Sequence, residues 1–597
     1  MLEVENLCIA FKTKQGLRQV VKNMSLSVRP GEIVGLVGES GSGKTLMSLG
    51  IMRLLPQNAV ITGGSVRVGD TDMLSLDAES LRRLRGSRIS MVFQDPLSSL
   101  DPVFTCGDQI VDAIRLHENV SRAEAWSRGV ELLRKERIAD PERCMKSYPH
   151  ELSGGQCQRV MIAMAVACRP QIIIADEPTT ALDVTVQKQV LDILRELNRE
   201  VGAAILLITH DLGVIYEVAD RVVVMYRGEK MEEASTADLF AAPKSDYTRA
   251  LIGAMPVLGE RREQLPTVAS ALADQRQGAQ ASGAPDGNAG ASAGARPLLY
   301  AVPAAASQCA PQPAATGRPP ARRRVDTLSP LLRVQGLSKT YVVRDGPFAA
   351  ARAFRAVDDV SFEIPFRTTM GLVGESGCGK STLSRLIMRL IAPDAGGIVF
   401  DGEDLAGLSG RALRRARRDM AMVFQDPYGS LNPRQTVEEL IAEPLVVNGR
   451  STERSQIVTR MLDCVGLPRS ALTRYPHEFS GGQRQRIAIA RALALHPALV
   501  ICDEAVSALD VSVQAQVLNL LKELQREFDL TYLFISHDLS VVEHMSDTIV
   551  VMQKGRIVES GTADSIFAAP QHDYTKTLLG AVPRVARPIT PSQALSS

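Results

Sequence analysis

The chain has 597 residues, of which 45% are hydrophobic and 23% are charged. This is the composition of ordinary globular protein, and the chain is too long for one core, so we expect several domains. The 68 basic and 67 acidic residues leave a net charge of +1, which gives no reason to expect binding to nucleic acid or to an anionic membrane surface.

The sequence shows no signal for export or membrane insertion. The N-terminus lacks a basic region followed by an apolar stretch, and no apolar run reaches the roughly 18 residues that a membrane helix needs. The nine cysteines contain no C-x-x-C pair. This argues against a zinc site or a disulfide framework and favours a reducing compartment.

A phosphate-binding loop is predicted at residues 38–45 (GESGSGKT), which fit the pattern G-x-x-x-x-G-K-[ST]. The apolar residues 33–37 before it predict a buried strand, and residues 46–49 after it are compatible with a helix. Glycines let the loop backbone form a nest of N–H groups at a helix N-terminus, which favours anions. In this motif Lys44 reaches the β- and γ-phosphates and Thr45 holds Mg²⁺.

The same motif occurs again at residues 374–381 (GESGCGKS), after the apolar residues 370–373. Lys380 and Ser381 take the positions of the lysine and the hydroxyl residue. A chance match explains one loop more easily than two in corresponding contexts, so we predict nucleoside triphosphate binding in both halves.

A pair of acids follows an apolar strand downstream of each loop: Asp176-Glu177 and Asp503-Glu504. Acids at the carboxyl end of a parallel strand face the ligand crevice. The first acid is expected to contact Mg²⁺, through water, and the second to orient or deprotonate the attacking water. The alternative is a pair of acids that only caps a strand.

A histidine, His210 or His537, also follows an apolar strand in each half. Taken alone, either is more readily structural than functional. Each lies 57 residues after a serine, since 210 − 153 and 537 − 480 are equal. This equal spacing favours a functional role.

Those serines, Ser153 and Ser480, each begin a segment S-G-G-Q before a helical run. Two adjacent glycines there make a second anion-binding turn. One such turn per domain is enough to bind ATP. The second is explained if each turn closes over nucleotide held by the other half.

The two halves therefore repeat one fold. The phosphate loops are 374 − 38 = 336 residues apart, and from Ser153 onward the offset is constant at 480 − 153 = 327. We expect one domain at 1–258, a flexible Ala/Pro/Gly-rich linker at 259–330, a second domain at 331–583 and a disordered tail at 584–597.

Apolar runs alternate with helical stretches in each half, which predicts α/β domains with a mainly parallel sheet. Helical subdomains are expected between Gln94 and Ser153 and between Gln425 and Ser480.

These combined motifs resemble the ATP-binding-cassette (ABC) family over about residues 1–256 and 331–583. The resemblance implies two P-loop NTPase nucleotide-binding domains, each with a RecA-like α/β core, an antiparallel β part and a helical subdomain. It also implies a head-to-tail arrangement in which the S-G-G-Q turn of each half completes the ATP site of the other. Gln94 and Gln425 match the family's Q-loop glutamines. Phe11 and Tyr341 match the aromatic position that stacks on adenine, with a core aromatic as the alternative for each.

Loop chemistry and the resemblance together assign the site residues. Catalysis is expected from Glu177, Glu504, His210, His537, Gln94 and Gln425. Mg²⁺ is expected to be held by Thr45, Gln94, Asp176, Ser381, Gln425 and Asp503. Nucleotide binding is expected from Phe11, Gly38, Ser40, Gly41, Gly43, Lys44, Thr45, Ser153, Gly154, Gly155 and Gln156, and from Tyr341, Gly374, Ser376, Gly377, Gly379, Lys380, Ser381, Ser480, Gly481, Gly482 and Gln483.

Finer features are similar to the dipeptide/oligopeptide/nickel importer ATPases, a group that includes glutathione importers. They are the residues around each Q-loop glutamine (93–102 and 424–433), Y-P-H-E before each S-G-G-Q, and D-Y-T at 246–248 and 573–575. The resemblance implies an ATP-hydrolysing importer subunit for di- or oligopeptides or glutathione, peripheral on the cytoplasmic face of the inner membrane. Its implied partners are two permease subunits and an extracytoplasmic solute-binding protein, with no nucleic acid.

Many of these relatives carry a cysteine-rich iron–sulfur segment after the first cassette. Here that region offers only Cys309, so we expect no cluster, and ATP and Mg²⁺ are the expected cofactors.

The alternative function is a soluble tandem-cassette ATPase acting on ribosomes or DNA. Ribosome-binding members need a charged helical linker and DNA-repair members carry C-x-x-C pairs, neither of which is present. A tandem sugar importer predicts one degenerate half, but both catalytic glutamates remain, so we expect two hydrolytic sites.

Overall fold

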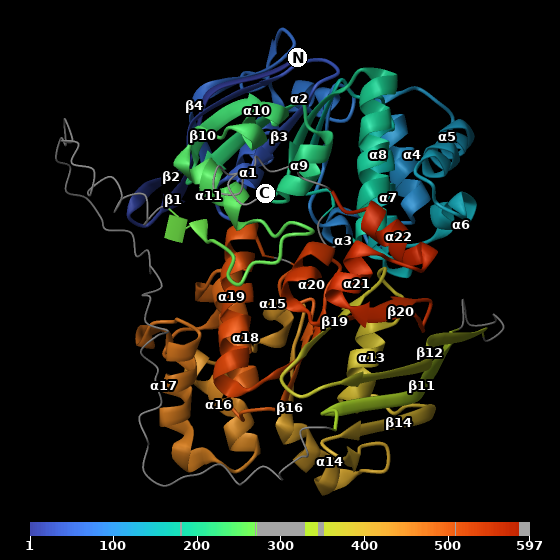
Figure 1. Cartoon of the computed structure of the whole chain (residues 1–597). Helices are drawn as coiled ribbons and strands as arrows, with labels where there is room; N and C mark the ends of the chain where they lie inside the picture. Colours follow the sequence, from blue (N-terminus) through green and yellow to red (C-terminus); the bar gives the residue numbers. More distant parts are fainter. Residues whose placement is uncertain (180–181, 269, 272–328, 344–351, 508, 584–597) are drawn as a thin grey trace, which may run out of the picture. The chain divides into compact units, whose positions relative to one another are not determined.

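The structure is a computed structural model of the chain, shown in Figure 1. It describes residues 1–179, 182–268, 270–271, 329–343, 352–507 and 509–583. The chain forms two compact units. Of the described residues, the first unit holds those in Met1–Met255 together with Pro583, and the second unit holds those in Pro256–Val582. Most of the predicted linker, Cys309 and the predicted tail lie outside the described residues.

The core of the first unit is a six-stranded sheet in the order β10-β9-β3-β8-β7-β6. All neighbouring strands run parallel except the antiparallel edge strand β10. Every residue of β3, β7 and β8 is buried, as the near-continuous apolar sequences of parallel strands covered on both faces require. The strands are β3 (Ile33–Val37), β6 (Ile89–Val92), β7 (Ile172–Asp176), β8 (Ala204–Ile208), β9 (Arg221–Tyr226) and β10 (Glu229–Ser235).

A second, antiparallel sheet in the order β2-β1-β4-β5 packs against this core. Its apolar side chains, such as Val4 and Ile9, share one hydrophobic cluster with Leu36 and Ile174 of the parallel sheet. The strands are β1 (Leu2–Thr13), β2 (Gly16–Val28), β4 (Ala59–Val68) and β5 (Thr71–Asp72).

The helical subdomain of the first unit is inserted between β6 and β7 and lies to one side of the sheets in Figure 1. It has its own buried cluster, which includes Ile110, Leu133 and Val160. Its helices are α4 (Cys106–His117), α5 (Arg122–Lys135), α6 (Pro141–Lys146), η1 (Pro149–Glu151) and α7 (Gly154–Val166). The other helices are α1 (Lys44–Ile51), α2 (Ala78–Leu84), α3 (Pro96–Ser99), α8 (Val184–Val201), α9 (Leu212–Val218), α10 (Thr236–Ala241) and α11 (Asp246–Ala254).

The second unit repeats this architecture with sheets in the orders β12-β11-β14-β15 and β16-β17-β18-β13-β19-β20. Its strands are β11 (Leu332–Val343), β12 (Arg352–Ile364), β13 (Thr369–Val373), β14 (Ala395–Phe400), β15 (Glu403–Asp404), β16 (Met420–Val423), β17 (Leu499–Asp503), β18 (Thr531–Ile535), β19 (Thr548–Gln553) and β20 (Arg556–Thr562). Its helices are α13 (Lys380–Ile387), α14 (Gly410–Ala416), η3 (Arg417–Asp419), α15 (Pro427–Ser430), α16 (Val437–Val447), η4 (Ser451–Glu453), α17 (Arg454–Cys464), η5 (Arg469–Ala471), η6 (Pro476–Glu478), α18 (Gly481–Leu493), α19 (Val511–Phe528), α20 (Leu539–Met545), α21 (Ala563–Ala568) and α22 (Asp573–Gly580). The predicted fold, with parallel core, antiparallel part and inserted helices, is confirmed in both units.

The predicted linker begins at residue 259, and the structure describes residues 259–268 at its start. Residues 256–268 belong to the second unit, and Leu265 and Val268 are each only 4% exposed. Leu265 also exchanges hydrogen bonds with Asn519 of α19. Composition averaged over the whole stretch hides these two apolar residues, which are buried in the structure.

A glycine at a register shift in each antiparallel sheet offers a test of this fold. Gly64 has φ +95°, and a Cβ added there would stand 2.5 Å from the backbone oxygen of Asn6. Its neighbour Gly63 has no atom within 4 Å of such a Cβ. We expect Gly64→Ala to lower the free energy of unfolding by about 1–3 kcal/mol, the usual cost of a strained backbone position.

Thermal unfolding of the full chain measures this difference, with Gly63→Ala as the matched control. Gly396 and Gly397 form the corresponding pair in the second unit, where a Cβ on Gly396 would stand 2.4 Å from the Gly336 oxygen. Equal melting temperatures for the two substitutions of either pair would contradict this strand register.

Candidate nucleotide-binding sites

The first phosphate loop connects β3 to α1. One of its glycines allows close packing against the sheet, and another leaves space on the open side of the loop. A Cβ on Gly38 would stand 2.1 Å from the Met225 backbone oxygen, so this side of the loop is packed against β9. Gly41 has φ +77° and no atom within 4 Å of an added Cβ. The loop is therefore closed on one side and open on the other, as a cradle for a phosphate chain must be.

The lysine of each loop is buried and folded back over the loop backbone. Lys44 Nζ donates to the carbonyl oxygens of Gly38 and Glu39 at 2.7 and 3.1 Å. Lys380 Nζ donates to those of Gly374 and Glu375 at 2.6 and 2.8 Å. Both lysines are only 5% exposed, and these hydrogen bonds hold each ammonium group at the loop.

A tyrosine from a distant helix supports each loop, and the sequence reasoning missed this role. The hydroxyl of Tyr247, on α11, accepts a hydrogen bond from the Glu39 N–H at 3.3 Å. Tyr574, on α22, accepts one from the Glu375 N–H at 3.0 Å. Both tyrosines belong to the D-Y-T segments, whose constant offset of 574 − 247 = 327 was the available signal.

The first acid at the end of β7 lies against the first turn of α1. Asp176 accepts hydrogen bonds from Thr45 Oγ1 at 3.4 Å and from Ser48 Oγ at 3.2 Å. Burial and the charge of Glu177 raise the pKa of Asp176 to about 6, against the lowering effect of the two hydroxyls. A carboxylate and a hydroxyl that meet here provide the oxygen ligands that Mg²⁺ prefers.

The second unit brings the corresponding groups together in the same way. Asp503, at the end of β17, accepts from Ser381 Oγ and Ser384 Oγ, each at 3.4 Å. Burial and the charge of Glu504 raise the pKa of Asp503. The predicted lysine, hydroxyl and first acid therefore converge in both units.

The second acid of each pair is held between the predicted glutamine and histidine. In the first unit Gln94 Nε2 donates to Glu177 Oε2 at 2.8 Å, and His210 Nδ1 lies 3.1 Å from Oε1. In the second unit Gln425 Nε2 and His537 Nδ1 lie 2.6 and 3.5 Å from Glu504 Oε2. Three segments far apart in the sequence thus meet at one carboxylate.

Both glutamates occupy the left-handed backbone region, with φ +48° at Glu177 and +51° at Glu504. Such a conformation is uncommon for residues other than glycine and concentrates at functional sites. The Glu177 N–H donates to the Ile208 carbonyl at 2.8 Å and the Glu504 N–H to the Ile535 carbonyl at 2.9 Å. These backbone bonds fix where each carboxylate points.

The glutamates raise the pKa of both histidines, and His537 in turn lowers the pKa of Glu504. Burial lowers the pKa of His210, but the hydrogen bond and charge of Glu177 outweigh it and raise that pKa overall. The pKa of His537 is raised in the same way by Glu504. Burial raises the pKa of Glu504, but His537 and then Lys380 lower it below its ordinary value. These contacts therefore favour the ionised form of Glu504, which is the form a general base needs.

The S-G-G-Q segments lie at the N-termini of α7 and α18. Each serine and glutamine form a capping box: Ser153 N–H donates to Gln156 Oε1 at 3.0 Å and Ser480 N–H to Gln483 Oε1 at 3.1 Å. Ser153 and Ser480 are exposed. The glycines Gly154, Gly155, Gly481 and Gly482 form the first turn of their helices, where free backbone N–H groups attract anions.

The two predicted adenine-stacking residues lie on the antiparallel sheets. Phe11 is on β1, opposite Arg18 of β2, and is half-buried. Tyr341 is on β11, opposite Phe354 of β12, and is 36% exposed, with Lys339 Nζ at 5.9 Å from its ring centroid. Neither ring belongs to the buried core, and their stacking on adenine stays a prediction.

These residues fit ATP and Mg²⁺ in both units. An open glycine cradle, a buried lysine beside it, and a carboxylate beside a hydroxyl supply the groups that recognise a triphosphate and a hard cation. Cys378 lies in the second loop, and burial raises the pKa of its thiol, while Lys380 lowers it less. This thiol is therefore a packed side chain and not a thiolate nucleophile.

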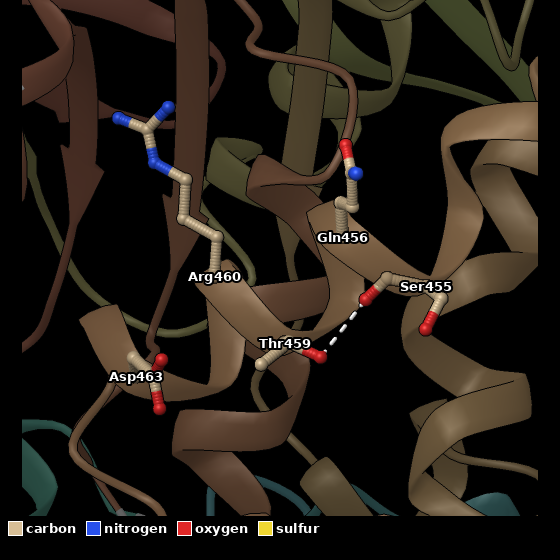
Figure 2. A pocket seen from close by; sticks show the side chains of 5 residues that line it. All are labelled: Ser455, Gln456, Thr459, Arg460 and Asp463. Atoms are coloured by element: carbon tan, nitrogen blue, oxygen red, sulfur yellow. Dashed lines mark hydrogen bonds between the residues drawn. The ribbon is translucent and has the colours of Figure 1, made fainter. Parts of the chain in front are cut away.

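A separate pocket lies on α17 of the second unit (Figure 2). It has a volume of about 370 Å³ and is lined by Ser455, Gln456, Thr459, Arg460 and Asp463. Thr459 Oγ1 donates within the helix to the Ser455 carbonyl at 2.9 Å. The pocket contains none of the predicted site residues.

The fold and the two repeated sites define a tandem ATP-binding-cassette ATPase. Residues 21–180 and 357–507 match the ABC transporter family, which is more than half of the chain, so the chain belongs to that family. Residues 231–284 and 558–596 match the C-terminal region of oligopeptide/dipeptide transporters.

Named relatives match the chain along almost its whole length. It is 44% identical over 596 residues to the glutathione import ATP-binding protein GsiA of Pectobacterium atrosepticum, covering 98% of this chain and 89% of the relative. It is 45% identical over 601 residues to GsiA of Escherichia coli O157:H7, covering 98% and 90%. Among solved structures, cbiO1 of Clostridium perfringens, part of the ABC transporter complex cbiONQ, is 27% identical over 40% of this chain and 92% of that one, with a TM-score of 0.36.

The tyrosine contact gives a prediction for each site. We expect Tyr247→Phe to weaken ATP binding in the first unit about two- to tenfold, because a typical hydrogen bond contributes about 0.5–1.5 kcal/mol and 1.4 kcal/mol corresponds to tenfold. Titration with a fluorescent nucleotide measures the change, and Tyr574→Phe is the matched variant of the second unit. Tyr216→Phe, whose ring packs edge-on against Phe240, is the control. Unchanged binding in both tyrosine variants would contradict the support assigned to these hydroxyls.

Proposed function

We propose that this chain is the ATP-hydrolysing subunit of an importer for peptides, with glutathione or other short peptides as the imported class. The observation that carries the proposal is its 44–45% identity, over 98% of the chain, to proteins named as glutathione import ATP-binding proteins. The match to the oligopeptide/dipeptide transporter C-terminal region supports the same class of substrate. Complete sets of catalytic groups in both units support two hydrolytic sites.

Hydrolysis follows from the groups around the second acid. Glu177 orients or deprotonates the attacking water, while His210 Nδ1, 3.1 Å from Glu177 Oε1, positions the carboxylate. Lys44 and the loop N–H groups stabilise negative charge on the phosphates as the bond to the leaving group breaks. Mg²⁺, held near Thr45 and Asp176, supplies further neutralisation of that charge when bound. Glu504, His537, Lys380, Ser381 and Asp503 do the same in the second unit.

We further propose that each S-G-G-Q turn completes the ATP site of the other unit. Its exposed serine and the helix N-terminus behind it form an anion-binding turn beyond what one phosphate loop requires. ATP would then join the two units, and release of phosphate would separate them, which is a population shift driven by differential binding.

The two glutamines could couple ATP hydrolysis to a partner protein that contacts the loops in which they lie. Gln94 and Gln425 are exposed, each lies just after an edge strand of the parallel sheet, and each donates to the glutamate proposed as the base. A permease that moves the loop after β6 or β16 would thereby change the hydrogen bonding of the base. We propose two permease subunits as these partners, a solute-binding protein as the source of substrate, and the cytoplasmic face of the membrane as the place of action.

None of the described helices combines the length and apolar character needed to span a bilayer. The alternative of a tandem ATPase for ribosomes or DNA has no support from the relatives, which are named for import. Reconstitution with candidate permeases and their solute-binding protein tests the import proposal. We expect ATP-dependent accumulation of radiolabelled glutathione or a short peptide in vesicles. Co-purification with ribosomes or DNA and no permease-dependent uptake would overturn the proposal.

A test of symmetry uses the two glutamates one at a time. We expect Glu177→Gln and Glu504→Gln each to lower ATP turnover by about 10²–10⁴-fold at its own site, the usual contribution of a general base. ATP binding should remain, because neither change touches the phosphate loops. Steady-state ATPase rates with parallel nucleotide titrations measure both effects. If one substitution abolishes turnover and the other leaves it unchanged, the two sites are not equivalent.

A further inference from the structure

The chain segment that follows the first cassette is bound to the second unit by a set of specific contacts. We call residues 256–268 the strap. It begins directly after α11 and Met255, where the first unit ends, and it belongs to the second unit. The face that receives it is formed by α19 and α20, which are labelled in Figure 1.

The centre of the contact is one amide side chain. Asn519 of α19 accepts from the Leu265 N–H at 2.9 Å and donates to the Leu265 carbonyl at 2.7 Å. Both backbone groups of one strap residue are thus satisfied by one side chain, as a strand neighbour would satisfy them. The Leu265 side chain is buried at the same point. Leu265 therefore binds the second unit both through its apolar side chain and through its backbone hydrogen bonds.

Charged and polar contacts extend the interface on both sides of Leu265. The Gly259 N–H donates to Glu543 Oε2 at 2.9 Å, and Arg261 donates to the Ser546 carbonyl at 2.7 Å. Arg261 also lies 3.5 Å from Asp547 and 3.8 Å from Asp564. Glu263 pairs with Arg526 at 3.0 Å on the exposed rim.

The strap covers two groups that are costly to bury. Burial, followed by the charges of Arg261 and Arg526, lowers the pKa of Lys522 to about 8. His544 is 2% exposed, neither of its ring nitrogens has a hydrogen-bond partner in the described chain, and burial together with Lys522 lowers its pKa to about 4. Lys522 Nζ donates to the Arg262 carbonyl of the strap at 3.4 Å, so a partly desolvated lysine of the second cassette lies directly against the strap.

The duplicated face of the first unit is built differently. With the constant offset of 327, Asn519, Lys522 and His544 correspond to Asp192, Arg195 and Glu217. There Arg195 lies 3.3 Å from Glu217 and 3.9 Å from Asp192, so α8 and α9 satisfy their own charges. The second unit lacks both acids, and the amide that replaces the first of them binds the strap.

The end of the second cassette provides an independent parallel. Pro583 lies 583 − 256 = 327 residues after Pro256, and Pro583 is assigned to the first unit. Pro583 packs at the start of α9, where its Cβ is 3.2 Å from the position of a Cβ added to Gly213. The proline at which the chain leaves each cassette is thus assigned to the opposite unit, at the same position of the repeat.

From these contacts we infer that the α19–α20 face of the second cassette is a docking site for the strap, and that the strap stays bound to this face even when the chain is cut beyond it. Only the chain beyond the strap then acts as linker. The inference rests on contacts within the second unit and is independent of what the importer carries.

Hydrogen exchange of the intact full-length chain, without nucleotide, tests the docking site. We expect slow exchange over residues 256–268, because the Gly259 and Leu265 amides are bonded to side chains. Leu265→Asp and Asn519→Ala should each accelerate exchange in this segment about tenfold or more. The matched control is Asp192→Ala, the same position in the first unit, which should leave the segment unchanged. Exchange of the wild-type strap at the rate of an unstructured peptide, or equal rates in all three variants, would overturn the docking site.

A cleavage experiment tests whether the strap stays bound to this face once the chain is cut beyond it. A specific protease site is inserted between Gly283 and Ala284, the full-length chain is cut, and the product is examined by size-exclusion chromatography without nucleotide. We expect the two pieces of the wild-type protein to elute together and those of Leu265→Asp to elute apart. Separation of the wild-type pieces at the same concentration, or joint elution of the Leu265→Asp pieces, would refute this retention. The exchange rates of α19 and α20 in Leu265→Asp show whether the second cassette itself stays folded.

Discussion

Each site depends on a buried carboxylate at the end of a central parallel strand, placed within hydrogen-bond distance of the first turn of a helix. Asp176 meets Thr45 and Ser48 there, and Asp503 meets Ser381 and Ser384. An ionised aspartate in that position is energetically unfavourable because it is buried, and the raised pKa of Asp176 reflects this. It is tolerated because hydroxyl donors and a buried lysine surround it, and a site of this kind gains most when a cation arrives.

The next residue converts the end of the strand into a catalytic position. A left-handed backbone at Glu177 and Glu504 turns the chain sharply, so that two adjacent acids point to different partners. One remains at the helix, and the other reaches the glutamine after β6 or β16 and the histidine after β8 or β18. Three neighbouring parallel strands thereby deliver three side chains to one place, which is why the ligand edge of this sheet carries the chemistry.

The sequence predicted much of this because local patterns encode it. Phosphate loops, acids after apolar strands, and equal spacings can be read along the chain, and the parallel sheet brings them together. The Tyr247 hydroxyl could not be predicted in the same way, since its partner amide at Glu39 is 208 residues away. The strap was missed for a different reason: Leu265 and Val268 are isolated in polar sequence, and the burial of Leu265 depends on a surface formed 254 residues later.

The two cassettes are nearly identical in chemistry where nucleotide is expected and different where the strap lies. The lysine, hydroxyl, acids, glutamine and histidine have the same partners in both units, with distances that differ by a few tenths of an ångström. Against that background, replacement of Asp192 and Glu217 by Asn519 and His544 changes an internally paired face into one that needs an external partner. A fused chain can supply that partner at high effective concentration from its own connecting segment. Duplication has thus left two matching sets of side chains at the phosphate loops and one surface that differs between the first and the second cassette.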